Sequence, residues 1–294
     1  MEDSMQWARE LGGRLADAAE PDARQGFIRL CSPLELQKYR LSNTARNPER
    51  DEYVRRVLAE LTSGRPWRRF SFPADTLEQL EQLKPKVGNF GHVIECVMDA
   101  ISLPLSYRKP ITITPMLGVG EPGLGKSYFT YRLAGSLGVP LRRVAMDNLQ
   151  VGPSLAGSSY VYYNSETGTV FNVLTQKTHI SSVIILDEID NADGNFANSD
   201  ALGPLHNLLE PESAKVFQDA SANYIDEIPA TIRSRFEVFE IGSPGHGERL
   251  SALKGICEEL VGEYPGIEFN DELLGKLMGR TLTLQSPQCQ SSDL

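Results

Sequence analysis

Cysteine and histidine are scarce in this sequence, whose 294 residues contain four of each. The cysteines are scattered and form no CxxC pair: Cys31, Cys96, Cys257 and Cys289. Structural zinc sites use closely spaced cysteine and histidine pairs, and small secreted domains use dense cysteines for disulfides. We therefore expect neither a zinc site nor a disulfide framework.

Long apolar runs are also missing. No stretch of the chain approaches the roughly 18 consecutive apolar residues that a membrane-spanning helix requires. The N-terminal segment, MEDSMQWARELGGRLADAAE, is acidic at once and lacks the apolar centre of a signal peptide. We expect no membrane association and no secretory leader, and we predict a cytoplasmic protein.

Positive charge is the third feature in short supply. The 39 acidic residues outnumber the 29 basic ones and give a formal net charge of −10, whereas nucleic-acid binding depends on clustered lysine and arginine. The only basic cluster of note is Arg65, Arg68 and Arg69 around Trp67. Contact with nucleic acid or phosphate is one interpretation of this cluster, but we favour a solvated face. We expect no nucleic-acid partner.

The spacing of apolar residues divides the chain into a helical first part and an alternating second part. Helical spacing is found over 49–61 and 90–103, with a proline-containing loop signal over 64–73 between them. From residue 111 onward, predicted strands at 111–119, 141–146 and 183–186 alternate with predicted helices at 127–137, 169–179 and 201–209. This alternation is typical of an α/β fold with a parallel sheet covered on both faces.

The segment from Gly120 to Ser127, GEPGLGKS, matches the pattern GxxxxGK[ST] and lies between a predicted strand and a predicted helix. Gly120, Gly123 and Gly125 would let the backbone turn tightly, so that its N–H groups and the helix N-terminus face a phosphate. Lys126 would reach the β- and γ-phosphates, and the Ser127 hydroxyl would ligate Mg²⁺. The motif predicts a site for ATP and Mg²⁺ in a P-loop NTPase with a three-layer α/β sandwich.

A second candidate site element is the apolar run VIILDE, which ends in the carboxylates Asp187 and Glu188. Adjacent residues on a strand point to opposite sides, but where the strand ends the chain turns and both can face one site. Asp187 suits coordination of Mg²⁺ through water, and Glu188 suits a general base that polarises the attacking water. An ordinary strand end is the alternative, and the upstream P-loop favours the functional interpretation.

Beyond these two motifs, the chain resembles the ATPase module of Lon-type AAA+ proteins over roughly residues 90–278. The stretch PMLGVGEPGLGKSYFTYRLAGSLGVP is similar to the family's P-loop strand and helix. The stretch LDEIDNADGNFANSDALGPLHNLLEPESAKVFQD is similar to the family's LDEID segment, which continues into a helix ending LL(D/E)P and then F-x-D. The resemblance implies a helical N-terminal region over 1–88, an AAA+ domain over 89–242 and a partial helical lid over 243–280. We expect the polar tail over 281–294 to be disordered.

The resemblance also implies roles for three further residues. Tyr162, within GSSYVYYNSETG, falls at the aromatic position of the family's pore loop, although tyrosines on a half-buried strand or hairpin are the alternative. Asn223 looks like the sensor-1 residue that helps to orient the attacking water. Arg235 matches the arginine finger, which acts in trans on a neighbouring subunit, and Arg233 is a surface alternative. These matches imply a homo-oligomeric ring with a protein substrate threaded through its pore.

The sequence departs from the family pattern in two places. The F-x-D at 217–219 runs directly into the segment of Asn223, without the loop and most of the strand that separate them in relatives. Because backbone groups of a sheet must pair somewhere, we expect either that the sheet closes up in an unusual way or that the chain folds poorly. The Ser-Pro at 286–287 is followed by Gln288 where relatives carry a sensor-2 arginine, and nothing resembling the family's Ser-Lys protease domain follows.

Two functional hypotheses follow from this balance of matches and departures. The first is a Lon-like AAA+ ATPase that hydrolyses ATP and remodels or unfolds proteins. The second is a catalytically weak nucleotide-binding scaffold or truncated remnant, which the missing strand and the missing sensor-2 arginine favour. A DNA-loading ATPase is disfavoured by the acidic charge and the lack of a basic stripe.

Overall fold

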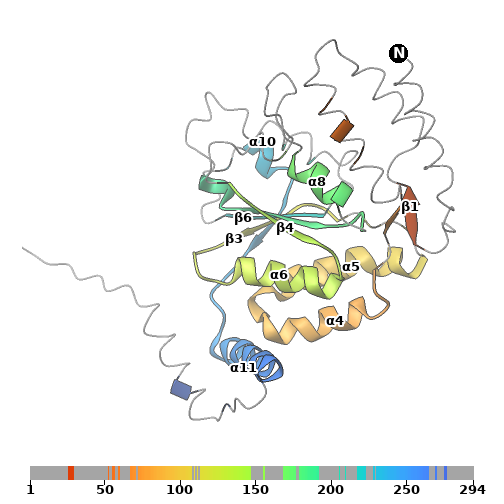
Figure 1. Cartoon of the computed structure of the whole chain (residues 1–294). Coiled ribbons are helices and arrows are strands. Elements are labelled where there is room, and N and C mark those ends of the chain that lie inside the picture. The colour runs from red at the N-terminus through yellow and green to blue at the C-terminus, as the bar shows by residue number, and fades with distance from the viewer. Residues whose placement is uncertain are drawn as a thin grey trace, which may run out of the picture.

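The computed structural model describes residues 26–29, 67–70, 72–107, 113–146, 168–176, 179–191, 217–222 and 230–264, with isolated positions outside these ranges. Its centre is a sheet of five strands in the order β4–β5–β6–β3–β7, in which every neighbouring pair is parallel (Figure 1). The strands are β3 (Met116–Val119), β4 (Leu141–Ala145), β5 (Val183–Asp187), β6 (Phe217–Ala222) and β7 (Glu237–Glu240).

Helices cover both faces of this sheet, which gives the three layers of a P-loop α/β fold. Figure 1 shows one face covered by α4 (Thr76–Leu83), α5 (Gly91–Tyr107) and α6 (Lys126–Leu137), and the other by α8 (Thr169–Gln176) and α10 (Ala230–Arg233). In β5, Val183 and Ile185 pack into the core on the first face, while Ile184 and Leu186 pack into the core on the second. This alternation is the period-two geometry of a strand that is buried on both sides.

Most of the elements expected in the alternating part are confirmed, with shifted ends. The helices expected over 127–137 and 169–179 are α6 and α8, and the strands expected over 141–146 and 183–186 are β4 and β5. The strand expected over 111–119 is shortened to β3, because Pro115 directly precedes it and has no N–H to donate to a neighbouring strand. The helices expected over 49–61 and 201–209 lie largely outside the described residues.

The central sheet closes up at the position of the shortened segment. The segment that begins with the F-x-D at 217–219 is itself the strand β6, which pairs in parallel with β5 on one side and with β3 on the other. Met116 of β3 is aligned with Asp219, and Ile185 of β5 is aligned with the same residue. One short segment therefore occupies the central position, and ladder pairing on both sides provides partners for its backbone groups. Of the two outcomes expected for the shortened segment, the closing up of the sheet is the one that the described strands show.

The loop expected over 64–73 is also corrected, and the solvated basic face is wrong for Arg68 but holds for Arg69, which is exposed. Trp67–Arg69 form the strand β2, which pairs antiparallel with β1 (Phe27–Arg29). Arg68 is fully buried and its Nε donates a hydrogen bond of 3.0 Å to the carbonyl oxygen of Leu174 in α8. Arg69 points to the other side of the strand, where its guanidinium lies 5.8 Å from the centre of the Phe27 ring. Arg68 is therefore a structural arginine, since a buried charge of this kind needs polar partners.

The helix α11 (His246–Glu263) follows β7 and begins where the partial lid was expected. It packs against two short 3-10 helices, η2 (Lys84–Lys86) and η3 (Gly88–Phe90), which precede α5. The segment after β7 is thus joined to the segment that leads into the sheet. None of the helices that the structure describes combines the length and apolarity needed to cross a membrane.

The core between α6 and the sheet gives a prediction for stability. Leu133 is fully buried in this core, whereas Tyr131 of the same helix is 65% exposed. Replacing Leu133 with alanine should lower the free energy of unfolding by about 2–5 kcal/mol, because the removed methyl groups leave a cavity. Tyr131→Ala should change it by no more than about 0.5 kcal/mol. Urea denaturation of the two variants tests this, and equal losses would contradict the packing described.

Candidate functional site

The GxxxxGK[ST] segment connects the central strand β3 to the helix α6. Gly123 and Gly125 have φ angles of 84° and 85°, in the left-handed region that glycine adopts without strain. Gly125 is the N-cap of α6 and offers no side chain to the N–H groups of the first helical turn. A glycine-rich turn in front of an α-helix of this length is suited to bind an anion, because the helix N-terminus carries partial positive charge.

Lys126 is the first residue of α6, and its side chain folds back over this loop. Its Nζ donates a hydrogen bond of 2.5 Å to the carbonyl oxygen of Gly120 and lies 3.4 Å from that of Glu121. Partial burial lowers the pKa of the Lys126 ammonium, whereas the carboxylates of Asp190, Asp187 and Glu188 act to raise it. The cation is thus held at the mouth of the loop, with acidic groups of the β5 end close enough to influence it.

Ser127 and Asp187 meet although they are 60 positions apart in the sequence. The Ser127 Oγ lies 3.4 Å from Asp187 Oδ2, and the Asp187 side chain is only 9% exposed. Mg²⁺ in proteins is usually bound by one or two hard oxygen ligands and retains several water molecules. One hydroxyl and one carboxylate beside an anion-binding loop therefore fit a magnesium ion that also contacts phosphate.

Glu188, directly after β5, has a backbone conformation that is uncommon for its residue type. Its φ angle is 56°, whereas non-glycine residues seldom adopt positive values. The Glu188 side chain is exposed, while Asp187 before it and Asp190 after it are buried. The turn at Glu188 thus separates one carboxylate that faces solvent from two that do not. Strained backbone of this kind is concentrated at functional sites.

Arg143 of β4 is a site residue that the sequence reasoning missed. Its Nε donates a hydrogen bond of 2.7 Å to Asp187 Oδ2, and one of its terminal nitrogens forms an ion pair with the same oxygen. The register of the parallel pair β4–β5 aligns Ala145 with Asp187, so the side chain reaches across from the neighbouring strand. An arginine within the predicted strand over 141–146 could have signalled this pairing, because strands of a buried parallel sheet are usually apolar.

Gly120 is fixed by packing rather than by its φ angle. A methyl group added at Gly120 would collide with the carbonyl oxygen of Ile241 and lie 3.0 Å from a methyl group of Leu124. The Ile241 N–H donates a hydrogen bond of 2.7 Å to the carbonyl oxygen of Val119, the last residue of β3. The segment after β7 therefore lies against the start of the phosphate loop, and glycine is the only residue that this contact accommodates.

Three of the predicted site residues are not brought to this place by the described structure. Tyr162 and Asn223 lie outside the described residues, although Asn223 directly follows β6 in the sequence. Arg235 lies between α10 and β7, and the first residue of β7 is aligned with Met116, the first residue of β3. Since Gly120 follows the last residue of β3, Arg235 lies at the opposite end of the strands from its own phosphate loop.

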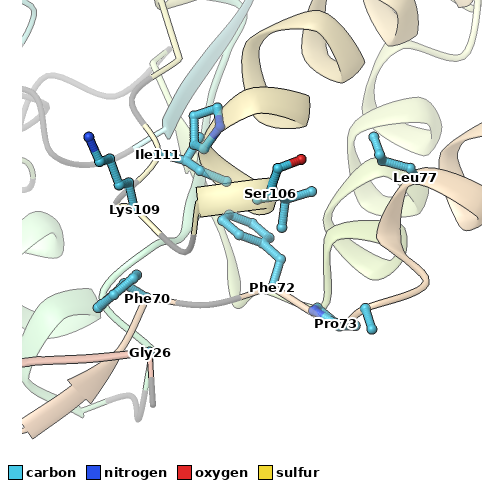
Figure 2. Close-up of a pocket in the computed structure, with 11 residues that line it drawn as sticks. Gly26, Phe70, Phe72, Pro73, Leu77, Ser106, Lys109 and Ile111 are labelled. Atoms are coloured by element: carbon cyan, nitrogen blue, oxygen red, sulfur yellow. The ribbon is translucent and has the colours of Figure 1, made fainter. Parts of the chain in front are cut away.

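A separate cavity of about 560 Å³ lies beside the chain that leads into β3 (Figure 2). Its lining is mainly apolar and includes Phe70, Phe72 and Leu77, with Ser106 and Lys109 as polar members. Ile111, which precedes β3, also lines it, so the cavity is at the amino ends of the strands. The residues that line it in the described part of the chain do not include Lys126, Ser127, Asp187 or Glu188, which lie at the carboxyl ends of the strands.

Comparison with known proteins agrees with this geometry. Residues 116–243 match the family described as "ATPase family associated with various cellular activities (AAA)". The chain is 26% identical over 219 residues to a Lon protease of Chloroflexus aggregans, covering 68% of this chain and 25% of that protein. It is 30% identical over 158 residues to a Lon protease of Helicobacter pylori (48% and 19%), and 26% identical over 298 residues to a "Lon protease 2" of Bdellovibrio bacteriovorus (90% and 36%). The chain thus spans between 19% and 36% of the length of these relatives.

The ion pair at Asp187 generates the prediction for this site. Replacing Arg143 with methionine should lower the free energy of unfolding by about 1–2 kcal/mol, because the nearly buried Asp187 loses its charged donors while the exposed arginine was partly screened by solvent. Added Mg²⁺ should restore part of this loss, since a cation that binds the folded state stabilises it. Urea denaturation with and without Mg²⁺ measures both effects.

Arg142→Met provides the matched control, because Arg142 is the exposed neighbour on the same strand. We expect this change to shift the free energy of unfolding by no more than about 0.5 kcal/mol. Equal effects of the two substitutions would show that Arg143 does not stabilise Asp187.

Proposed function

Because the chain contains an AAA+ ATPase module of the Lon-like type, we propose that this module binds ATP with Mg²⁺ and hydrolyses it to ADP and phosphate. The observation that carries the proposal is the convergence of the Lys126 loop with Ser127 and Asp187, whose side-chain oxygens lie 3.4 Å apart. An ammonium and a helix N-terminus beside a hydroxyl and a carboxylate are the groups that a nucleoside triphosphate with a divalent cation requires.

The side chains of the site divide into groups that bind and groups that activate water. The loop N–H groups and the Lys126 ammonium bind the β- and γ-phosphates. Ser127 and Asp187 would hold Mg²⁺, which would neutralise charge on the phosphate oxygens. Glu188 orients and polarises the water that attacks the γ-phosphorus in line with the leaving oxygen. The exposure of Glu188 at the end of β5 supports this role, and Asn223 is proposed to orient the same water.

Arg235 is proposed to complete the site of a neighbouring copy of the chain. Its position at the amino ends of β3 and β7 is remote from its own phosphate loop, so a role on the γ-phosphate requires a second subunit. An arginine supplied in trans stabilises the charge that develops on the transferred phosphoryl group. This arrangement supports a homo-oligomeric ring, as the resemblance to Lon-type AAA+ proteins implies.

We further propose that ATP hydrolysis drives the remodelling or unfolding of a protein substrate. Relatives at 25–26% identity are Lon proteases, which align with this chain over part of their length. Tyr162 is the residue proposed to grip an extended polypeptide in the central channel. The hypothesis of a weak scaffold depended partly on a missing central strand, and β6 removes that argument. No observation among the described residues favours the scaffold.

Two substitutions separate binding from hydrolysis. Lys126→Ala should weaken binding of a fluorescent ATP analogue at least about tenfold and abolish phosphate release, because it removes the ammonium that lies over the loop. Glu188→Gln should leave binding within about twofold of the unmodified protein and lower phosphate release by a factor of about 100 or more, because the amide cannot act as a base. Titration with the analogue and a phosphate-release assay on the same samples measure both quantities.

Glu240→Gln is the control for Glu188→Gln, since Glu240 is also exposed at the carboxyl end of a strand of the sheet. We expect it to retain both binding and phosphate release. Loss of binding in Glu188→Gln, or unchanged phosphate release, would contradict the role of Glu188 as the base. Unchanged binding in Lys126→Ala would contradict the proposed nucleotide site as a whole.

A further inference from the structure

Asn89 connects two segments that are far apart in the sequence. It lies in η3, just before α5, and its Nδ2 is 3.2 Å from the carbonyl oxygen of Leu124 and 3.3 Å from that of Gly242. Leu124 belongs to the phosphate loop, and Gly242 lies in the segment between β7 and α11. A primary amide nitrogen carries two hydrogens, so one side chain can donate to both carbonyl groups at once.

The contact with Leu124 restrains the part of the phosphate loop that is least restrained by its own residues. Leu124 lies between Gly123 and Gly125, whose positive φ angles and lack of side chains leave the backbone many alternatives. The peptide unit that carries the Leu124 carbonyl also carries the Gly125 N–H, and a trans peptide plane directs these two groups to opposite sides. A hydrogen bond that fixes the carbonyl on the side of Asn89 therefore directs the Gly125 N–H away from Asn89.

The contact with Gly242 restrains the start of the connection to α11. Ile241, the preceding residue, already donates its N–H to Val119. Further along, Glu248 in the first turn of α11 accepts a hydrogen bond of 2.6 Å from the N–H of Gly245. The same Glu248 side chain fills the space where a Cβ at Gly88 would lie. The segment η3 thus contacts the connection at Gly242 and α11 itself at Glu248.

We propose that Asn89 is a positioning residue that holds the phosphate loop and the segment leading to α11 in one arrangement, so that binding at the loop and the position of α11 are coupled. The role in nucleotide binding rests on the proposed function of the loop. The role of the amide does not, because the two carbonyl acceptors belong to the protein. Asparagine is suited to this position since aspartate has the same shape but no hydrogen to donate.

Asn89→Asp tests the inference with little change of side-chain volume. In nucleotide-free protein, amide hydrogen exchange should become faster in peptides covering 118–129 and 239–249, and remain unchanged in peptides from the buried strand β5. The KM for ATP should rise about tenfold, which corresponds to about 1.4 kcal/mol of binding free energy, while kcat changes less than about threefold. Asn89→Ser, which retains one hydroxyl donor, should give smaller effects in the same two segments.

Gln82→Glu is the matched control, because it makes the same amide-to-carboxylate change at an exposed position of α4, where the Gln82 amide donates to Glu78 and the described contacts include neither of the two segments. It should leave exchange in both segments and KM unchanged. Unaltered exchange in Asn89→Asp, or faster exchange in only one of the two segments, would overturn the coupling. A fall in kcat with unchanged KM would overturn the positioning role at the loop. Failure of the unmodified protein to bind ATP would contradict the proposed function alone, and the exchange measurement would still decide the inference.

Discussion

The pairing of β6 with both β3 and β5 is the constraint on which the rest of the site depends. It places β6 between β3, which leads into the phosphate loop, and β5, which ends at Asp187, so that these two strands are separated by one strand. All strands are parallel, so their carboxyl ends meet at the same edge of the sheet. The approach of Ser127 to Asp187 follows from this arrangement. A sheet without β6 would have brought different strands together or left backbone groups without partners.

The charged side chains at this edge of the sheet lie close together, and neighbouring groups hold them in place. Asp187 is nearly buried and is held by Arg143 from the adjacent strand, while Lys126 is turned toward the carbonyl oxygen of Gly120. Burial disfavours the charged form of Lys126, and the nearby carboxylates favour it. In a polyanion bound to a divalent cation, the negative charge would meet Lys126 and the cation would meet Asp187. The described residues therefore suit that ligand better than a simple anion.

Local sequence patterns were sufficient for the parts of the structure whose chemistry is contiguous. The phosphate loop, the buried strand β5 with Asp187, and the helix α6 could all be predicted because their glycines, apolar runs and carboxylates are adjacent in the chain. Arg143 and Asn89 could not, since each acts on a residue at least 35 positions away. The sequence left open whether the shortened segment could still form a central strand, because strand pairing requires only enough residues to reach both neighbours, and β6 has them. Arg68 was placed on the surface because arginine usually is, and only the fold brings the Leu174 carbonyl to it.

The glycines of the phosphate loop differ in what preserves them. Gly123 and Gly125 have open space around their Cα atoms and are required by their backbone angles, whereas Gly120 is required by the carbonyl oxygen of Ile241. Selection for a correctly closed sheet and connection would therefore retain Gly120 in a descendant of this chain that no longer used nucleotide. In such a lineage, selection would no longer act on Lys126 as a phosphate ligand, whereas the first glycine of the motif would persist because the packing against Ile241 requires it.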